Sequence, residues 1–201
     1  MGAVTQSRLF KYNKNGNLTE KTDRNDRVTE FDYDDLGRLT AERWMNEETG
    51  QTTIHTIAFD YDLAGQMKSA AEEDTSTTYS EYGYTYDRTG RLTGVAAAHL
   101  GVGATLVHGY DNAGLRTSTT ATTLVGSTET DDFENIYYYD HLNRLKRVDQ
   151  DDRGEAAVAE KRVDLAYDLA GQFAAIARYK DLDGGSTHEV ATGTPSTRRA
   201  A

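Results

Sequence analysis

The sequence predicts an all-β protein made of consecutive β-hairpins that form a curved or spiral antiparallel sheet. A phrase of the form Tyr-Asp-x-x-Gly-Arg-Leu recurs along the 201 residues, and its flanks alternate between apolar and polar. Recurrence about every 20 to 50 residues indicates a repeat architecture, and alternation with period two indicates strands. Tyrosine is the main large side chain, with 13 copies against 5 of phenylalanine. Because it buries a ring and keeps a polar tip, it suits a thin, half-wet sheet.

The phrase occurs in seven strong copies. The two clearest run from Tyr33 to Leu39 and from Tyr86 to Leu92. Looser copies begin at Tyr12, Tyr61, Tyr110, Tyr139 and Tyr167. A degenerate copy, residues 22–28, lies between the first two. The turn keeps its length while the interval between copies varies, so the variation is expected in the loops that join one hairpin to the next.

Each copy specifies a tight turn. A type I turn prefers Asp or Asn at its first position and Gly at its fourth, and the Asp carboxylate can accept from the backbone two residues on. The Gly takes the left-handed conformation that closes a three-residue hairpin loop with a bulge. Asn143 replaces this Gly in one copy and tolerates the same conformation. The repeat-defining residues are Tyr12, Gly16, Tyr33, Asp34, Gly37, Arg38, Leu39, Tyr61, Asp62, Gly65, Tyr86, Asp87, Gly90, Arg91, Leu92, Tyr110, Asp111, Gly114, Tyr139, Asp140, Asn143, Tyr167, Asp168 and Gly171.

This turn geometry predicts which residues face each other. The first turn residue faces the fifth, so Asp34 faces Arg38 as an opposite charge. One step further out, Tyr33 faces Leu39 on the other face of the sheet. The same pairing of a tyrosine with an apolar residue is expected for Tyr86 with Leu92, Tyr61 with Met67, Tyr139 with Leu145 and Tyr167 with Phe173.

One copy breaks this pairing. After Gly114 come Leu115 and then Arg116, so an arginine stands where the apolar partner of Tyr110 is expected. The sequence leaves two arrangements open. Either the register shifts in this hairpin, or Tyr110 packs on a neighbouring hairpin.

The repeat array is expected to span residues 8–180, as about seven hairpins with no domain boundary among them. Within it, residues 95–100 are compatible with a helical turn or with an extended connection. Residues 181–201 are rich in Ser, Thr, Gly and Arg and contain the only proline, Pro195. They are expected to form a polar, disordered tail.

Charge and composition exclude several functions. The net charge of −11 repels phosphates, which argues against nucleic-acid binding. The absence of cysteine excludes disulfides and thiolate zinc sites. No apolar run approaches the roughly 18–20 residues of a membrane span. Neither a signal peptide nor a transmembrane segment is expected in this chain, and membrane insertion is not expected.

No catalytic, cofactor-binding or metal-binding set is expected either. The five histidines show no paired ligand spacing, and neither a Gly-x-Ser-x-Gly elbow nor a cysteine nucleophile is present. Residues 13–17 and 181–185 are similar to parts of calcium loops but lack the distal glutamate, which leaves weak calcium binding or a plain turn. The paired carboxylates 131–132 and 151–152 are expected in solvated loops, where no apolar pocket frames them.

The repeated phrase resembles the YD repeats of the Rhs family, which also occur in teneurins and in the BC shell of Tc toxin complexes. Residues 33–40 and 86–93 match the consensus throughout, and residues 114–117 resemble a family variant ending Gly-Asn-Arg-Thr. The resemblance covers roughly residues 8 to 180. It implies a spiral sheet enclosing a hollow shell, which in bacterial members often houses a C-terminal toxin and in teneurins serves adhesion. The family's autoproteolytic segment has no match here, so autoproteolysis is not expected.

The resemblance makes a non-catalytic structural repeat module the leading hypothesis: part of an RHS/YD-repeat shell in a secreted or cell-surface protein of the toxin encapsulation or delivery type. The alternative is a carbohydrate- or protein-binding adhesion module, and the third hypothesis is an enzyme or toxin fragment. Seven hairpins are too few to close a shell. The expected partners are therefore the rest of a longer YD-repeat chain, with a toxin cargo, a surface glycan or a protein as further possibilities, and no cofactor is expected.

Overall fold

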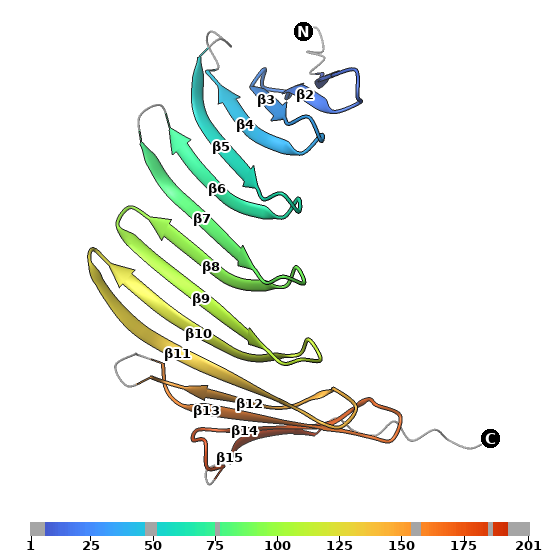
Figure 1. Cartoon of the computed structure of the whole chain (residues 1–201), viewed down its shortest axis with the longest axis vertical. Coiled ribbons are helices and arrows are strands. Elements are labelled where there is room, and N and C mark those ends of the chain that lie inside the picture. The colour runs from blue at the N-terminus through green and yellow to red at the C-terminus, as the bar shows by residue number, and fades with distance from the viewer. Residues whose placement is uncertain (1–6, 47–51, 75–76, 154–157, 185–186, 193–201) are drawn as a thin grey trace, which may run out of the picture. The chain divides into compact units, whose positions relative to one another are not determined.

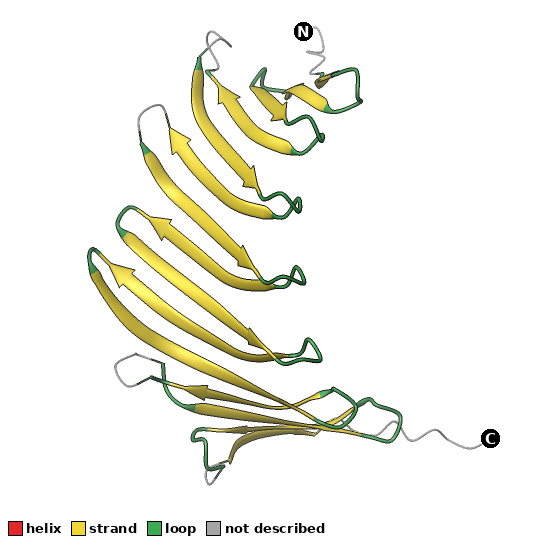
Figure 2. Cartoon of the chain, viewed as in Figure 1, coloured by secondary structure: helices red, strands yellow, loops and turns green. Residues whose placement is uncertain are grey.

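The computed structural model describes residues 7–46, 52–74, 77–153, 158–184 and 187–192 (Figure 2). These residues form strands and turns without a helix, and none of them therefore belongs to a helix that could cross a membrane. The all-β prediction is confirmed for them. The chain divides into two compact units, Met1–Gly101 (unit 1) and Val102–Ala201 (unit 2), so the expected array falls into two parts built from the same kind of hairpin.

In the described residues, unit 1 contains eight strands and unit 2 contains seven; Figure 1 shows their arrangement within each unit. Those of unit 1 are β1 (Leu9–Tyr12), β2 (Leu18–Thr22), β3 (Val28–Tyr33), β4 (Leu39–Met45), β5 (Thr53–Tyr61), β6 (Met67–Asp74), β7 (Thr78–Tyr86) and β8 (Leu92–His99). Those of unit 2 are β9 (Val102–Tyr110), β10 (Arg116–Val125), β11 (Thr128–Tyr139), β12 (Leu145–Asp151), β13 (Lys161–Tyr167), β14 (Phe173–Tyr179) and β15 (Thr187–Thr192).

Within each unit, every strand pairs antiparallel with the next strand along the chain. The period-two alternation explains why these segments are strands, since Ile57, Phe59 and Tyr61 of β5 lie on one face as their spacing predicts. Strand β8 continues to His99, so the extended alternative for residues 95–100 is the one that the structure shows. Strands β4 to β8 bend along their length (Figure 1).

The repeat turns have the predicted geometry. The N–H of Gly37 donates to the carbonyl of Asp34 (2.9 Å), and the N–H of Asp34 donates to the carbonyl of Arg38 (3.0 Å). This pair of bonds closes a type I turn followed by a bulge residue. Equivalent pairs close the turns that begin at Asn13, Asp23, Asp62, Asp87, Asp111, Asp140 and Asp168. The fourth turn position has positive φ, +79° at Gly37 and 61° at Asn143.

Seven of these turns follow a strict order. The turns after β1, β3, β5 and β7 lie along one edge of the unit 1 sheet, and those after β9, β11 and β13 lie along one edge of the unit 2 sheet (Figure 1). We call these the repeat edges. The degenerate copy, 22–28, makes the same turn with Asp26 at φ 60°, but it joins β2 to β3 and so lies at the opposite edge. The turn chemistry is reused there outside the repeat.

A second irregularity follows each repeat turn, and the sequence does not signal it. Tyr33 pairs with Leu39 as predicted, but Asp32 pairs with Ala41, which leaves Thr40 as an extra residue in β4. The same shift, one residue beyond the partner of the tyrosine, occurs in all seven repeat hairpins. The hairpin around 22–28 lacks it. A bulge of this kind leaves a backbone group outside the ladder and increases the local twist.

The repeat tyrosines bond to these bulges. Tyr61 Oη donates to the carbonyl of Leu39 in the preceding repeat hairpin (2.9 Å). The equivalent bonds join Tyr86 to Met67 (2.9 Å), Tyr139 to Arg116 (2.8 Å) and Tyr167 to Leu145 (2.7 Å). The acceptor is always the residue immediately before the extra one. Each of these tyrosines therefore packs in its own hairpin and satisfies the backbone of the hairpin before it.

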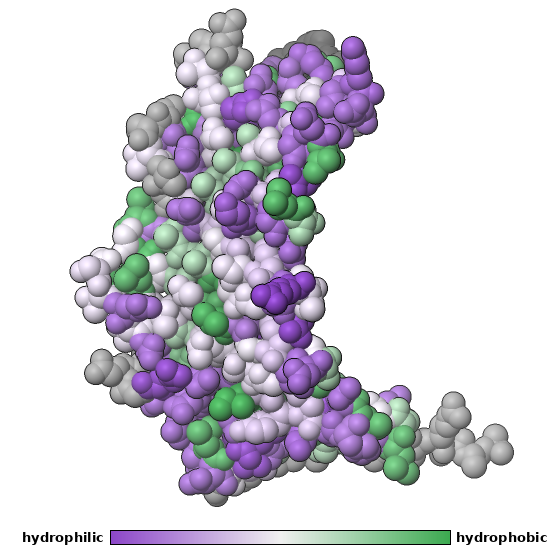
Figure 3. Space-filling view, in the orientation of Figure 1, coloured by the Kyte–Doolittle hydropathy of each residue, from purple (hydrophilic) through white to green (hydrophobic). Residues whose placement is uncertain are grey.

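The sheets carry almost no core. One face of each sheet holds the repeat tyrosines and their partners, and we call it the tyrosine face. No described side chain is fully buried, and the buried apolar residues are Met45 and Ala121. On the surface seen in Figure 3, hydrophobic side chains are scattered among hydrophilic ones rather than gathered in one patch. Stability must therefore come from ladder bonds and from contacts between neighbouring hairpins.

On the other face of unit 2, arginine and aspartate side chains alternate along and across β12 and β13. Arg147 pairs with Asp164 across the ladder, and Asp149 pairs with Arg162. Each arginine also makes two contacts to the aspartate two residues on, with distances of 2.6 to 2.9 Å. Asp149 is only 5% exposed. Both guanidinium groups donate to the carbonyl of Leu182, so the loop after β14 lies over these charges.

The expected tail, 181–201, contains a strand. β15 pairs antiparallel with β14, so disorder is not what the structure shows for residues 187–192. The physical reason is that β14 would otherwise present an unpaired edge, and the segment contains Val190 and a threonine at each end, residue types with high strand preference. Residues 193–201, with Pro195, lie outside the described part of the chain.

We expect Tyr61→Phe to lower the free energy of unfolding by about 1 kcal/mol, because the carbonyl of Leu39 loses its donor while the ring stays in place. Tyr12→Phe is the matched control, since Tyr12 is 62% exposed, and it should change the free energy by less than about 0.5 kcal/mol. Urea denaturation followed by circular dichroism measures both. Equal losses in the two variants would show that the hydroxyl does not couple the hairpins.

Candidate functional site

At the repeat edge, polar side chains converge in the same arrangement turn after turn. Asp34 Oδ1 accepts from the backbone N–H groups of Leu36 and Arg38 (2.9 Å each), and Oδ2 accepts from Arg38 Nε (2.6 Å). The same three contacts are made at Asp87 and Asp140. The carboxylate thus shapes the turn and holds the side chain at the fifth position, as the pairing of first and fifth residues predicts.

These contacts keep the carboxylates ionised. The backbone N–H of Arg38, helped by the guanidinium of the same residue, lowers the pKa of Asp34. The corresponding contacts from Arg144 lower the pKa of Asp140 to about 2. For Asp87 the hydroxyl of Thr89 is the largest cause of the lowered pKa. A group that stays charged far below neutral pH is a poor general acid or base there, so these aspartates build turns.

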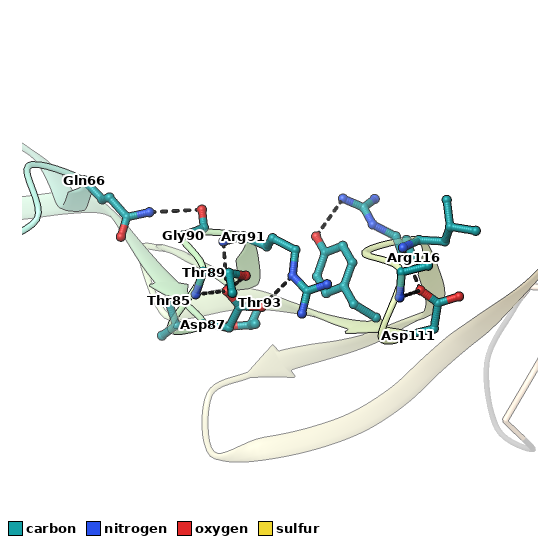
Figure 4. Close-up of polar contacts among 12 residues, drawn as sticks. Gln66, Thr85, Asp87, Thr89, Gly90, Arg91, Thr93, Asp111 and Arg116 are labelled. Atoms are coloured by element: carbon teal, nitrogen blue, oxygen red, sulfur yellow. Dashed lines mark hydrogen bonds and ion pairs between the residues drawn. The ribbon is translucent and has the colours of Figure 1, made fainter. Parts of the chain in front are cut away.

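Side chains at the fifth position reach the next turn along the repeat edge. Arg38 Nη1 donates to the carbonyl of Asp62 (3.3 Å), and the guanidinium lies 4.6 Å from the ring centroid of Tyr61. Gln66 Nε2 donates to the carbonyl of Gly90 (3.1 Å; Figure 4). Consecutive repeat turns are therefore joined by side chains as well as by the sheet.

The glycine at the fourth position has two roles. Its positive φ closes the turn, and its missing side chain leaves room for the fifth-position residue of the preceding repeat. A Cβ at Gly90 would lie 3.3 Å from Gln66 Nε2, and one at Gly65 would lie 3.8 Å from Arg38 Nη1. The equivalent neighbours are Asn17 at Gly37 (3.5 Å) and Arg144 at Gly171 (3.7 Å).

The hairpin of β9 and β10 departs from this pattern but keeps its register. Tyr110 pairs with Arg116, so of the two arrangements that the sequence leaves open, the register shift does not occur. The fifth position is Leu115, which has no polar group to donate. The following repeat turn has Asn143 in place of Gly. Its Cβ is accommodated because Leu115, at the fifth position of the preceding repeat, does not send a polar side chain into that space.

The described histidines do not assemble into a catalytic or metal site. His99 Nδ1 lies 2.8 Å from Ser80 Oγ, and His55 Nε2 lies 3.1 Å from Glu72 Oε1. Ser80 is only 7% exposed and lies in β7, which is paired on both sides. A nucleophile there would have neither access to a substrate nor a turn that presents oxyanion-binding N–H groups. These pairs are contacts within the sheet.

The acidic pairs lie differently from the expectation. Asp131 and Asp132 lie in strand β11 and not in a loop. The strand is long and begins at Thr128, directly after its turn, so it includes both aspartates. Asp151 ends β12, and it gathers with Asp152 and Glu160 so that one carboxylate oxygen of each lies within 4.8 Å of the others. Exposed acidic groups often cluster without an ion, and this cluster alone identifies no metal site.

The two stretches that are similar to calcium loops offer no cation site in their described residues. Asn13 Oδ1 is occupied by the N–H groups of Asn15 and Asn17 (3.0 Å each). In 181–184, the Leu182 carbonyl accepts from two arginines, whose charges oppose a cation at that oxygen. Gly185 lies outside the described residues.

An open groove of about 380 Å³ in unit 1 adjoins the only tryptophan. Trp44 is 45% exposed, its Nε1 donates to Glu42 Oε1 (2.9 Å), and its ring lies 4.5 Å from that of His55. The other lining residues are Lys21, Asp23, Arg27, Val28, Thr29, Met45 and Ile54. Two cations and two anions line the groove, so its charge indicates no particular class of ligand.

Comparison with known proteins agrees with the hairpin architecture. Residues 12–43 match the family model of the RHS repeat. Two solved structures are similar over 90% of this chain and 9% of theirs: the TcdB2–TccC3–Cdc42 complex (20% identity, TM-score 0.66) and TcdB2–TccC3 without its hypervariable C-terminal region (18%, 0.64). The Tc holotoxin pore of Photorhabdus luminescens is 13% identical, with a TM-score of 0.51, over 86% of this chain and 11% of that one. No curated protein sequence matches.

At these identities the structural likeness concerns the fold. This chain spans about a tenth of the length of the solved chains. The RHS-repeat match runs from the last residue of β1 into β4, so it includes the first two repeat turns and the reused turn between them. The turn and bulge geometry described above recurs well beyond those residues, in both units.

Two glycine variants separate the roles of the fourth position. Gly90 and Gly16 have φ of +85° and +84°, so replacing either by Ala should cost about 1–2 kcal/mol of left-handed strain. Gly90→Ala should cost more, because the new Cβ displaces Gln66, whereas nothing among the described residues lies within 4 Å of a Cβ at Gly16. Urea denaturation compares them. A cost at Gly90 no larger than at Gly16 would mean that the turn-to-turn contact contributes nothing.

The lowered pKa values predict a loss of stability in acid. The aspartates titrate near pH 4 in the unfolded chain and at lower pH in the folded one, so they favour folding above about pH 4, and this contribution disappears as the pH falls towards about 2. The contribution of these aspartates to the melting temperature should therefore be constant from about pH 7 to 5 and be lost between about pH 4 and 2. Asp140→Asn keeps the turn acceptor, as Asn13 does, and should show a smaller acid-induced fall. An identical fall in both proteins would contradict this origin.

Proposed function

We propose that this chain, which is similar to the RHS repeat over residues 12–43 and shares its fold with parts of the TcdB2–TccC3 structures, is a non-catalytic structural module. It would form a run of YD-repeat hairpins in the wall of a larger shell. The shell belongs to a secreted or cell-surface protein and encloses a cargo of the toxin-delivery type. One observation carries the proposal: repeat hairpins bond to other hairpins of the same kind, through four tyrosine hydroxyls and through the fifth-position side chains of Arg38 and Gln66.

The two sides of a hairpin differ, and this gives the array a direction. Towards the preceding hairpin, a repeat offers a tyrosine hydroxyl, as Tyr61 does to the carbonyl of Leu39. Towards the following hairpin, it offers the bulge carbonyl and the side chain at the fifth position, as Gln66 does to Gly90. The hairpin of β5 and β6 has both kinds of contact, through Tyr61 on one side and through Met67 and Gln66 on the other, which is the property that a continuous wall requires.

The chemistry of the edge also supports a structural role. Its carboxylates are held ionised by backbone N–H groups, and its arginines are held by those carboxylates or by the next turn. No group there is left poised to exchange a proton or attack a substrate. The proposal accordingly includes no cofactor and no catalytic step.

The fold shared with parts of the TcdB2–TccC3 structures and the Tc holotoxin pore supports a place in a toxin shell. Since this chain spans about a tenth of those chains, the remaining wall has to come from elsewhere. The proposed partners are further YD repeats of a longer chain and the cargo inside the shell.

The proposal predicts what the chain is found with in its source organism. Antibodies against it should recover, from the culture medium or the cell surface, polypeptide with further YD repeats and a cargo domain that resists trypsin until heating opens the shell. A cytoplasmic enzyme serves as the control for cell lysis. Recovery from the cytoplasm alone, or a co-purifying domain that trypsin digests equally fast before and after heating, would contradict a secreted, enclosing role.

A further inference from the structure

A shallow hollow of about 400 Å³ lies on the tyrosine face of unit 2, where the hairpin of β9 and β10 departs from the repeat. Its lining residues are Tyr110, Gly114, Leu115, Arg116, Tyr137, Tyr139 and Leu145. The other repeats have a polar residue at the fifth position and an apolar one at the sixth, as in Arg38 and Leu39. Here the order is reversed. Because successive strand residues point to opposite faces, the exchange moves the arginine from the repeat edge to the tyrosine face.

Arg116 is the charged group of this hollow. It is half-buried, its guanidinium lies 5.8 Å from the ring centroid of Tyr110, and its Nη2 is 3.5 Å from the hydroxyl of that tyrosine, the long limit of a hydrogen bond. The arginines of three regular repeats lie 2.6 to 2.7 Å from an aspartate. No carboxylate among the described residues lies within 4.0 Å of Arg116. A cation partly removed from water without a counter-ion is stabilised by an incoming anion.

The surrounding side chains are suited to the organic part of a ligand. The rings of Tyr137 and Tyr139 and the side chain of Leu145 give the hollow aromatic and apolar walls. Tyr139 Oη donates to the carbonyl of Arg116 (2.8 Å), and Tyr137 Oη donates to Thr119 Oγ1 (3.4 Å), so both rings are held in place and their hydroxyls are engaged. A ligand therefore meets fixed ring surfaces and one guanidinium.

No second cation competes for the ligand. His108, on the same face of β9, has its pKa lowered by burial and by the charge of Arg116, so its imidazole is neutral at pH 7. The net charge of −11 disfavours phosphate and other multiply charged anions. These features favour a ligand with a single negative charge and an apolar body.

We propose that this hollow binds a carboxylate attached to an aromatic or apolar group, with Arg116 as the carboxylate partner and the tyrosine rings against the organic part. The planar guanidinium matches a carboxylate in a two-point contact, which a lysine would not provide. The carboxylate comes either from a small aromatic acid or from a Glu or Asp side chain flanked by apolar residues in a polypeptide. This binding goes beyond the structural role of the array and does not depend on it.

The test is a titration of the full chain, labelled with ¹⁵N, in which NMR follows the Nε–H signal of Arg116 and the backbone N–H signals of Gly114 and Leu115, which also line the hollow. The backbone signals remain when Arg116 is replaced and so report binding in every variant. Benzoate should produce a saturable shift with a Kd of roughly 1–10 mM, as a single charged contact in a shallow site allows. Benzamide, of the same shape without the charge, should bind at least about tenfold more weakly. The peptide acetyl-Leu-Glu-Leu-amide and its Gln counterpart form the second arm. Whichever carboxylate binds more tightly identifies the source.

Variants at the site complete the test. Arg116→Met places at the sixth position the residue that Met67 provides in another repeat, so the fold should keep or raise its melting temperature while benzoate binding falls at least about tenfold. Arg116→Lys should retain part of the binding. Arg88→Met, at an exposed turn position, removes the same charge and should bind as the unmodified chain does. The proposal is overturned if neither carboxylate probe saturates the shift below about 50 mM, or if a folded Arg116→Met binds benzoate unchanged.

Discussion

The hydrogen bond from a repeat tyrosine to the carbonyl at the preceding bulge is the contact on which the rest of the structure depends. The bulge takes a carbonyl out of the ladder, and an unsatisfied backbone group costs about 1–3 kcal/mol where water cannot replace the lost partner. Tyr61 supplies the missing donor for Leu39. At four of the seven bulges the next hairpin brings a tyrosine hydroxyl that bonds to the bulge carbonyl, so the twist that these bulges add to the sheet does not leave that carbonyl without a donor.

Because of this dependence, the stability of each unit is set by single hairpins and by contacts between adjacent hairpins. With no described side chain fully buried, there is no shared core that would couple distant strands. A hairpin gains its stability from its own turn and from its two neighbours, as in other repeat proteins. The low hydrophobic fraction of 37% is consistent with this arrangement. The partly packed rings and hydrogen-bonded hydroxyls of the repeat tyrosines stabilise the sheets, as a buried apolar core stabilises a globular domain.

Much of this could be predicted from the sequence because the turn is local. Asp34, Gly37 and Arg38 interact within five residues, so spacing alone specifies the loop, the charge pairing and the partner of Tyr33. The extra residue after Leu39 could not be predicted in this way, since its cost is offset by a tyrosine 22 residues away. The turn-to-turn contacts were missed for the same reason. A glutamine four residues after an aspartate gives no sign that its amide reaches the next hairpin.

Two other features also lay beyond local reasoning. The division at residues 101 and 102 lies in a stretch rich in Gly and Ala, a composition that does not by itself mark a boundary between units. Strand β15 lies in a segment whose Ser, Thr and Gly content is typical of disorder, yet β14 provides an edge on which it can pair. For β15 the neighbouring strand decides the outcome, and that neighbour cannot be recognised from the sequence of the segment itself.

The hairpin of β9 and β10 shows how a departure from the repeat can be accommodated. With Leu115 at the fifth position and Arg116 at the sixth, the repeat edge lacks a polar side chain that could reach the next turn. The same exchange places a cation among the tyrosines. The first effect is compensated one repeat later, where Asn143 fills the space that a glycine elsewhere keeps open. The second has no equivalent compensation, since the described residues provide a tyrosine ring but no carboxylate for Arg116. An arginine at the sixth position also fits the Gly-Asn-Arg-Thr form of the repeat that residues 114–117 resemble, so the exchange by itself is compatible with a structural role. The proposed carboxylate site rests instead on the surroundings of the guanidinium, which lies half-buried against tyrosine rings.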